Sequence, residues 1–232
     1  MTEQYIFESP HTAAEACGEH LLMILDAAVH RGGTAHLAIS GGSSPKPMFD
    51  LWARSHFDWS PVHIYWVDER CVPPDHEQSN YRMARQHFLD PAGVPQANIH
   101  RIVAELPTQD ATKRYLAELP EAFDAIHLGV GPDAHTASLF PGAPEILDVE
   151  QRAAAVYVEK FSQWRITLLP RVLRACPEIA VLASGADKAE AISRILGEQP
   201  ADVLQYPAAI LRDIPGRVAW FLDHAASARL RG

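Results

Sequence analysis

The amino-acid sequence predicts one α/β domain with a mainly parallel β-sheet that is covered by helices on both faces. Apolar runs alternate with amphipathic stretches along the chain, the pattern of strands joined by crossover helices. No internal repeat, low-complexity tract or linker-like segment divides residues 1–232, so we expect a single domain. With 232 residues, 47% of them hydrophobic, the chain is long enough to bury a sizeable core.

Six apolar segments predict the strands. They are short, rich in apolar, β-branched and aromatic side chains, and bounded by polar or turn residues. In chain order these segments are residues 35–40, 62–67, 123–131, 153–159, 178–185 and 217–223.

Five amphipathic segments predict the helices. The first carries apolar side chains at helical spacing and ends at Gly32 and Gly33. We expect Ser79 or Asn80 to cap the third helix and Thr108 to cap the fourth. In chain order the five segments are residues 10–31, 46–54, 79–89, 108–118 and 187–196.

The net charge of the chain restricts the classes of partner that we expect it to bind. The chain has 20 Lys and Arg against 29 Asp and Glu, a formal net charge of −9. A nucleic-acid-binding protein normally shows a basic surface, so we expect no nucleic-acid partner. An anionic substrate fits this charge only if a local basic pocket works against the field of the whole protein.

The cysteines and the N-terminal residues indicate a cytoplasmic protein. Cys17, Cys71 and Cys176 lie far apart and form no Cys-x-x-Cys pair, which is typical of unpaired thiols in a reducing compartment. The first ten residues lack the basic segment and apolar run of a signal peptide, and no stretch approaches the roughly 20 apolar residues that cross a membrane. We therefore expect no membrane partner; a monomer is compatible with the sequence, which leaves the oligomeric state open.

Polar clusters follow four of the predicted strands. Ligands of open α/β sheets bind outside the carboxyl ends of the strands, so these clusters are expected to share one site. They are Ser40 to Ser44, Asp68 to Arg70, Asp133 to His135, and Ser184 to Lys188.

The segment Ser40-Gly41-Gly42-Ser43-Ser44-Pro45 follows a strand and precedes a helix. Glycines let the backbone approach an anion, and free N–H groups at a helix N-terminus point toward it. A plain strand-to-helix turn would explain the same residues equally well. The Gly-Lys-Ser/Thr ending of a Walker loop is absent.

The segment that begins at Gly129 formally matches the dinucleotide-binding pattern G-x-G-x-x-A. Phe140, Pro141 and Gly142 would end the following helix after fewer than two turns, which argues against a nicotinamide dehydrogenase. In the same segment His135 is expected at the start of a short helix, where Asp133 could orient it as a general base. A capping Asp and a structural His are the alternative interpretation.

Other charged residues offer anion contacts. Arg70 follows a strand together with Asp68 and Glu69, and for Glu69 we favour a solvated loop with an internal ion pair. Arg165 and Lys188 could bind a phosphate, although single residues of this kind are more often surface charges. No cluster of His, Asp and Glu has metal-ligand spacing, so we expect no metal site.

Several motifs together resemble the 6-phosphogluconolactonases. In order they are SGGSSP, WVDERCVPPDHEQSNY, LGVGPDAHTASLFPG, RITLLP, GADKAEAI and WFLD, and the likeness extends from about residue 10 to 228. This resemblance implies a modified Rossmann-like three-layer α/β/α sandwich. It also implies hydrolysis of 6-phospho-glucono-δ-lactone to 6-phosphogluconate, without a cofactor.

The resemblance also assigns roles to residues. His135 matches the proposed base, Asp133 its neighbouring acid, and Arg70 an arginine at the substrate. Ala134 stands where the family usually has Gly, which matters only if that position needs a positive φ, and Ser44 stands where Thr is usual. The sugar-phosphate contacts are matched by Gly41, Gly42, Ser43, Arg165 and Lys188, in a loop that also includes Ser40 and Ser44.

Two further functions have to be weighed. A glucosamine-6-phosphate deaminase should have Asp-Glu-Tyr at Asp68 to Arg70 and Asn-Glu-Pro near residues 138–141, and this chain has neither. A non-catalytic sugar-phosphate-binding module usually carries a separate DNA-binding segment, and none is left over here. We therefore expect a lactonase acting on a small phosphorylated sugar lactone, with the direct role of Asp68 left open.

Overall fold

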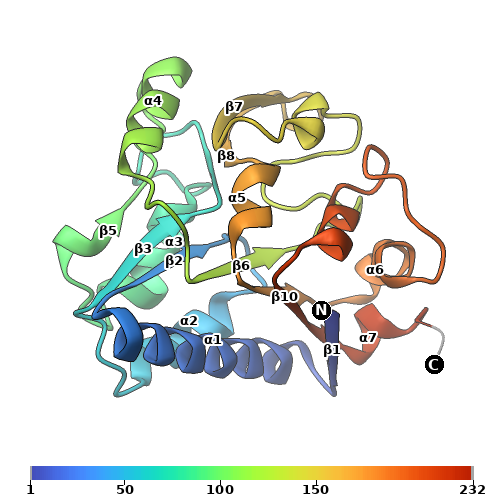
Figure 1. The fold of residues 1–232 in the computed structure, drawn as a ribbon, viewed down its shortest axis with the longest axis horizontal. Coiled ribbons are helices and arrows are strands. Elements are labelled where there is room, and N and C mark those ends of the chain that lie inside the picture. Colours follow the sequence, from blue (N-terminus) through green and yellow to red (C-terminus); the bar gives the residue numbers. More distant parts are fainter. Residues whose placement is uncertain (1, 231–232) are drawn as a thin grey trace.

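A computed structural model describes residues 2–230, and its centre is a seven-stranded parallel sheet. The strand order is β1-β10-β9-β6-β2-β3-β5, and every neighbouring pair in it is parallel. This confirms the predicted fold class (Figure 1). The strands are β1 Thr2–Phe7, β2 Ala35–Ile39, β3 Val62–Trp66, β5 Ile99–His100, β6 Ala125–Gly129, β9 Glu178–Ala183 and β10 Arg217–Asp223.

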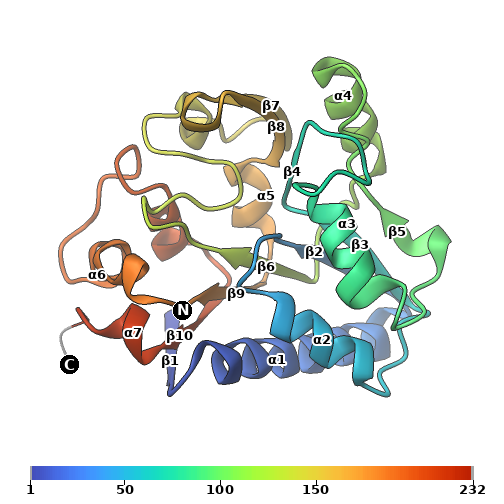
Figure 2. The same cartoon turned by 180° about the vertical axis from the view of Figure 1, so that it is seen from behind.

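Helices lie on both sides of the sheet. In both views α1 and α2 lie along one side, whereas α5 and a second, smaller sheet lie on the other (Figures 1 and 2). The α-helices are α1 Pro10–Gly32, α2 Lys46–Arg54, α3 Asn80–Ala84, α4 Thr108–Glu118, α5 Pro170–Ala175, α6 Ala189–Leu196 and α7 His224–Ser227. Shorter 3₁₀ or π turns are η1 Arg85–Leu89, η2 Gln96–Asn98, η3 Pro144–Leu147, η4 Glu159–Phe161, η5 Ala186–Lys188 and η6 Pro207–Asp213.

Local chemistry explains where the helices begin and end. Ser9 and Thr12 form a capping box at the start of α1, and Gly33 adopts a left-handed φ of 81° directly after it. Ser79 caps α3 as predicted, and the helix continues as the π turn η1. The prediction for Thr108 was wrong: it is the first residue of α4, and no side chain caps this helix.

The second sheet differs from the prediction. β4 Asp68–Arg70, β8 Gln163–Leu168 and β7 Ala153–Val158 form an antiparallel sheet in the order β4-β8-β7. The segment 153–159, predicted as a strand of the parallel sheet, is therefore a strand of this smaller one. Its partner is β8, which follows after the short turn η4, and such a hairpin needs no crossover helix.

A continuous apolar core fills the space between the parallel sheet and its helices. Phe49 and Trp52 of α2 pack against Trp59 and Phe88 with ring centroids 5.0–5.8 Å apart. Each such side chain contributes about 1.5–3 kcal/mol when it is fully buried. This packing holds α2 beside the carboxyl end of β2, where the cavity described below begins.

Candidate active site

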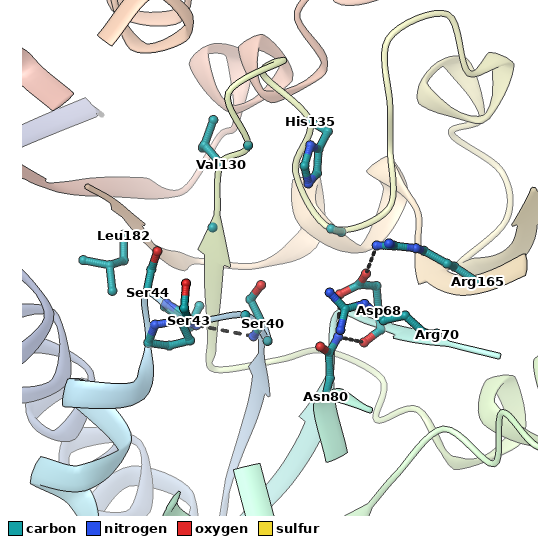
Figure 3. Close-up of a pocket in the computed structure, with 17 residues that line it drawn as sticks. Ser40, Ser43, Ser44, Asp68, Arg70, Asn80, Val130, His135, Arg165 and Leu182 are labelled. Atoms are coloured by element: carbon teal, nitrogen blue, oxygen red, sulfur yellow. Dashed lines mark hydrogen bonds and ion pairs between the residues drawn. The ribbon is translucent and has the colours of Figure 1, made fainter. Parts of the chain in front are cut away.

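The carboxyl ends of β2 and β6 open into a polar cavity of about 200 Å³ (Figure 3). Three of the four predicted clusters contribute residues to it, as expected for parallel strands that end at one edge. Its lining consists of Ser40, Gly41, Gly42, Ser43, Ser44, Pro45, Asp68, Arg70, Asn80, His127, Gly129, Val130, Gly131, His135, Ala137, Arg165 and Leu182.

The loop from Ser40 to Ser44 lies between β2 and α2. Gly42 adopts a φ of 95°, a left-handed conformation that favours glycine. A Cβ atom at Gly41 would lie 1.9 Å from Oδ1 of Asn80, so only glycine fits there. No side chain caps α2; the N–H of Lys46 donates to the Ser43 carbonyl oxygen over 3.3 Å and Pro47 has no N–H, so the anion contacts of this segment come from the loop rather than from a row of free helix N–H groups.

The turn after β6 carries His135. The short helix predicted here was wrong: residues 131–140 form turns with an isolated bridge between Thr136 and Leu139. Ala134 has a φ of 63°, so the position where the resembling family has glycine does adopt the left-handed conformation. Gly131 lets the His135 ring lie close to the backbone, because a Cβ atom at position 131 would lie 2.1 Å from that ring.

His135 and Asp133 form a hydrogen-bonded pair. The carboxylate Oδ1 of Asp133 lies at Nδ1 of His135, and a carboxylate only accepts, so the neutral ring donates through Nδ1 and keeps a lone pair on Nε2. Burial alone would raise the pKa of Asp133, but hydrogen bonds from His135 and Lys160 hold it well below its ordinary value. Asp133 therefore stays ionised and fixes the edge of the imidazole, while a face of the ring stacks on Phe140.

Asp68 and Arg165 form a buried polar group on the side of the small sheet. Asp68 Oδ2 accepts a 2.6 Å hydrogen bond from Ser138 Oγ and lies 3.8 Å from Nη1 of Arg165. Asn80 Nδ2 donates to Asp68 Oδ1 over 3.2 Å. Burial lowers the pKa of Arg165, and the Asp68 carboxylate counteracts this. These partners favour a positioning role for Asp68.

Arg70 and Arg165 lie directly opposite each other in the antiparallel β4–β8 pair, and both line the cavity. Like charges at such positions repel, so an anion between them would be stabilising. Arg70 Nη1 donates to the carbonyl oxygen of Gln78 over 2.5 Å, which orients this guanidinium from the outer side.

Glu69 has a different place from the one predicted. It is buried rather than in a solvated loop, and it makes no ion pair with Arg70. Its carboxylate accepts hydrogen bonds from Ser79 Oγ and from the backbone N–H groups of residues 70, 80 and 81. Burial raises the pKa of Glu69, and this effect outweighs the backbone N–H groups, which lower the pKa. Glu69 therefore ties β4 to the start of α3.

Two predicted site residues lie outside the cavity lining. Asp133 faces a neighbouring cavity of about 620 Å³ and reaches the site through His135. Lys188 bonds the carbonyl oxygen of Ser184 over 3.0 Å and lies 3.5 Å from Asp187.

Sequence reasoning missed four residues of the site or its surroundings. His127, a polar residue in an otherwise apolar strand, could have been noticed; its Nδ1 accepts a 3.3 Å hydrogen bond from the backbone of Ser40. Asn80 was considered only as a cap. Ser138 and Lys160 gave no signal, because their partners are distant in the sequence.

Among residues 2–230, no group of three or more His, Cys, Asp or Glu side chains is arranged to hold a metal ion. Within the same residues, none of the helices has both the length and the apolar character needed to cross a membrane.

The sequence and the fold that surround this cavity match a known family. The chain belongs to the family of glucosamine-6-phosphate isomerases/6-phosphogluconolactonase, which matches residues 8–220. A 6-phosphogluconolactonase of Synechocystis is 39% identical over 216 residues, 88% of each chain, and one of Nostoc is 35% identical over 221 residues, 90% of each chain. The crystal structure of a protein named devB is 35% identical, with a TM-score of 0.89 over 100% of both chains.

Proposed function

We propose that this protein hydrolyses 6-phospho-D-glucono-1,5-lactone to 6-phospho-D-gluconate, the second step of the oxidative pentose phosphate pathway. The observation that carries this proposal is the pair of His135 and Asp133, whose imidazole lines a cavity that also holds two guanidinium groups. The names of the relatives from Synechocystis and Nostoc support this choice of substrate.

A δ-lactone is an activated ester, so a general base and an oxyanion site are sufficient for its hydrolysis. His135 Nε2 removes a proton from a water molecule as the water oxygen attacks the C1 carbonyl. The negative charge moves to the carbonyl oxygen, where Arg70 and backbone N–H groups stabilise it. The C1–O5 bond then breaks, and the protonated imidazole returns its proton to the departing ring oxygen.

The phosphate is held away from the reacting carbon. The Ser40–Ser44 loop, with its glycines and serine hydroxyls, forms one side of this subsite, and Arg165 forms another. Lys188 is the further cation that the family motif assigns to the phosphate. These groups position the lactone and do not break bonds.

The direct test is to supply fresh 6-phosphogluconolactone and to follow acid release above the spontaneous rate. We expect His135→Asn to lower kcat by about 10²- to 10⁴-fold, the usual contribution of a general base, while the fold is kept. Ammonia release from glucosamine-6-phosphate is the control for the other activity named in the family. Wild-type turnover by purified His135→Asn would contradict the assignment of the base.

A further inference from the structure

The turn η4, Glu159–Phe161, brings the small sheet into contact with the catalytic pair. Lys160 Nζ lies 2.8 Å from Oδ2 of Asp133, while Oδ1 of the same carboxylate contacts His135. The next residue, Phe161, packs its ring edge-on to Phe140, 5.9 Å between centroids, and Phe140 stacks on the His135 ring at 4.1 Å. One turn therefore contacts both the acid and the aromatic support of the base.

We propose that Lys160 is a positioning residue that acts on His135 through Asp133. This inference rests on the proposed function for its kinetic readout only. Lys160 does not line the cavity with His135, and its side chain is 55% exposed, so it acts without touching the substrate.

The geometry of the carboxylate explains why Lys160 is needed. Asp133 follows directly after Pro132 in a turn, and both the imidazole and the backbone N–H of His135, the latter over 3.4 Å, contact Oδ1 alone, so they leave Oδ2 unheld. A second ion on Oδ2 fixes the plane of the group, so that Oδ1 stays at Nδ1 of His135. The result is a ring with its lone pair held on Nε2, the nitrogen that the proposed reaction uses.

The positive charge of Lys160 determines the direction of the pH effect that we expect when this residue is replaced. Its ammonium opposes the Asp133 carboxylate, which would otherwise favour the protonated imidazole more strongly. Removing this positive charge should make His135 easier to protonate. The other charged groups that line the cavity with His135 are Asp68, Arg70 and Arg165, and those beside Asp133 in the neighbouring cavity are Glu145 and Glu159. Each of these side chains is present in both Lys160 variants, so a difference between the variants reports the charge at position 160.

The kinetic experiment compares wild type with Lys160→Met and Lys160→Arg. For Lys160→Met we expect kcat to fall about two- to fivefold, the size for a half-exposed ion pair, with KM nearly unchanged. The acid limb of the kcat/KM profile should move to higher pH by about 0.2 to 0.7 of a unit. Lys160→Arg should restore both quantities. Lys113→Met, at an exposed position of α4, is the matched control.

A double-mutant cycle tests whether Lys160 acts through Asp133. On the background of Asp133→Asn, Lys160→Met should change kcat less than twofold, because the carboxylate that transmits its effect is gone. An equal loss on both backgrounds would overturn the proposal, and so would an acid limb that stays in place or moves to lower pH.

A measurement without substrate separates this proposal from the proposed function. The NMR titration of the His135 ring protons, assigned with His135→Asn, should shift to higher pH in Lys160→Met and return in Lys160→Arg. If the wild-type enzyme hydrolyses no lactone, the proposed function fails, while this titration still decides the role of Lys160. An unchanged titration in a folded Lys160→Met protein overturns it.

Discussion

Lys188 is not part of the cavity lining, which contains most of the predicted site residues. Its ammonium is held by the carbonyl oxygen of Ser184, within reach of Asp187, and its side chain is 17% exposed. A protein with a net charge of −9 repels a phosphorylated sugar at long range, so local cations have to overcome that field. The role of Lys188 as a phosphate ligand stays a prediction.

This role can be measured with two substrates. A charge-assisted hydrogen bond contributes about 1.5–3 kcal/mol, so Lys188→Ala should lower kcat/KM for the phosphorylated lactone by roughly 10- to 150-fold. The same variant should lose far less with glucono-δ-lactone, which has no phosphate. All rates are corrected for spontaneous hydrolysis. If both substrates lose the same factor, Lys188 acts on structure or catalysis instead.

At the scale of secondary-structure elements, the buried carboxylate of Glu69 holds the junction between β4 and α3. Glu69→Gln would point an amide NH₂ at backbone N–H groups that now find an acceptor, at a cost of about 1–3 kcal/mol for each group left unpaired. We expect urea unfolding to show this loss. Glu77→Gln, at an exposed position of the preceding loop, should stay within about 0.5 kcal/mol of wild type. Equal effects of the two substitutions would contradict this account of Glu69.

The elements show which parts of the fold could be predicted from the sequence. Buried strands such as β6 and β9 read as apolar runs, and the prediction found them. β1 was missed because its mixed polar and apolar residues form a largely exposed edge strand. β4 was missed because it has only three residues, all charged, and they become a strand only by pairing with β8, about a hundred residues later.

Part of the candidate site could also be grouped from the sequence once the strands were located. Strand ends collect at one edge, so Ser40, Asp68 and His135 could be grouped without coordinates. The contacts of Lys160 and Ser138 could not, because each depends on how the small sheet folds over the large one. The organisation of residues 1–232 as a single domain stays a prediction.

For the whole molecule, a buried histidine links stability to pH. Burial lowers the pKa of His127 from its ordinary value of 6.5 to about 3. Below pH 6.5 the unfolded chain binds a proton that the folded protein excludes. The contribution of His127 to the free energy of unfolding is therefore fully present above pH 6.5. It falls by about 1.4 kcal/mol per pH unit as the pH drops toward 3.

Urea unfolding at a series of pH values checks this dependence. His127→Gln should reduce the slope between pH 6 and 4 by about 1.4 kcal/mol per pH unit. A residual slope of the same sign is expected, since burial also lowers the pKa values of His20, His63 and His100. His56→Gln, at an exposed position, is the control. A wild-type slope in His127→Gln would show that this histidine is not the source.

The close approach of Gly41 to Asn80 also restricts which substitutions this sequence can accept during evolution. Because any side chain at position 41 would overlap the Asn80 amide, the two positions are not free to vary independently. A larger residue in the loop becomes tolerable only after position 80 has become smaller, and that first change removes the amide that holds Asp68. Evolution between these states would have to cross an intermediate with a damaged site, so the pair is a case of built-in epistasis.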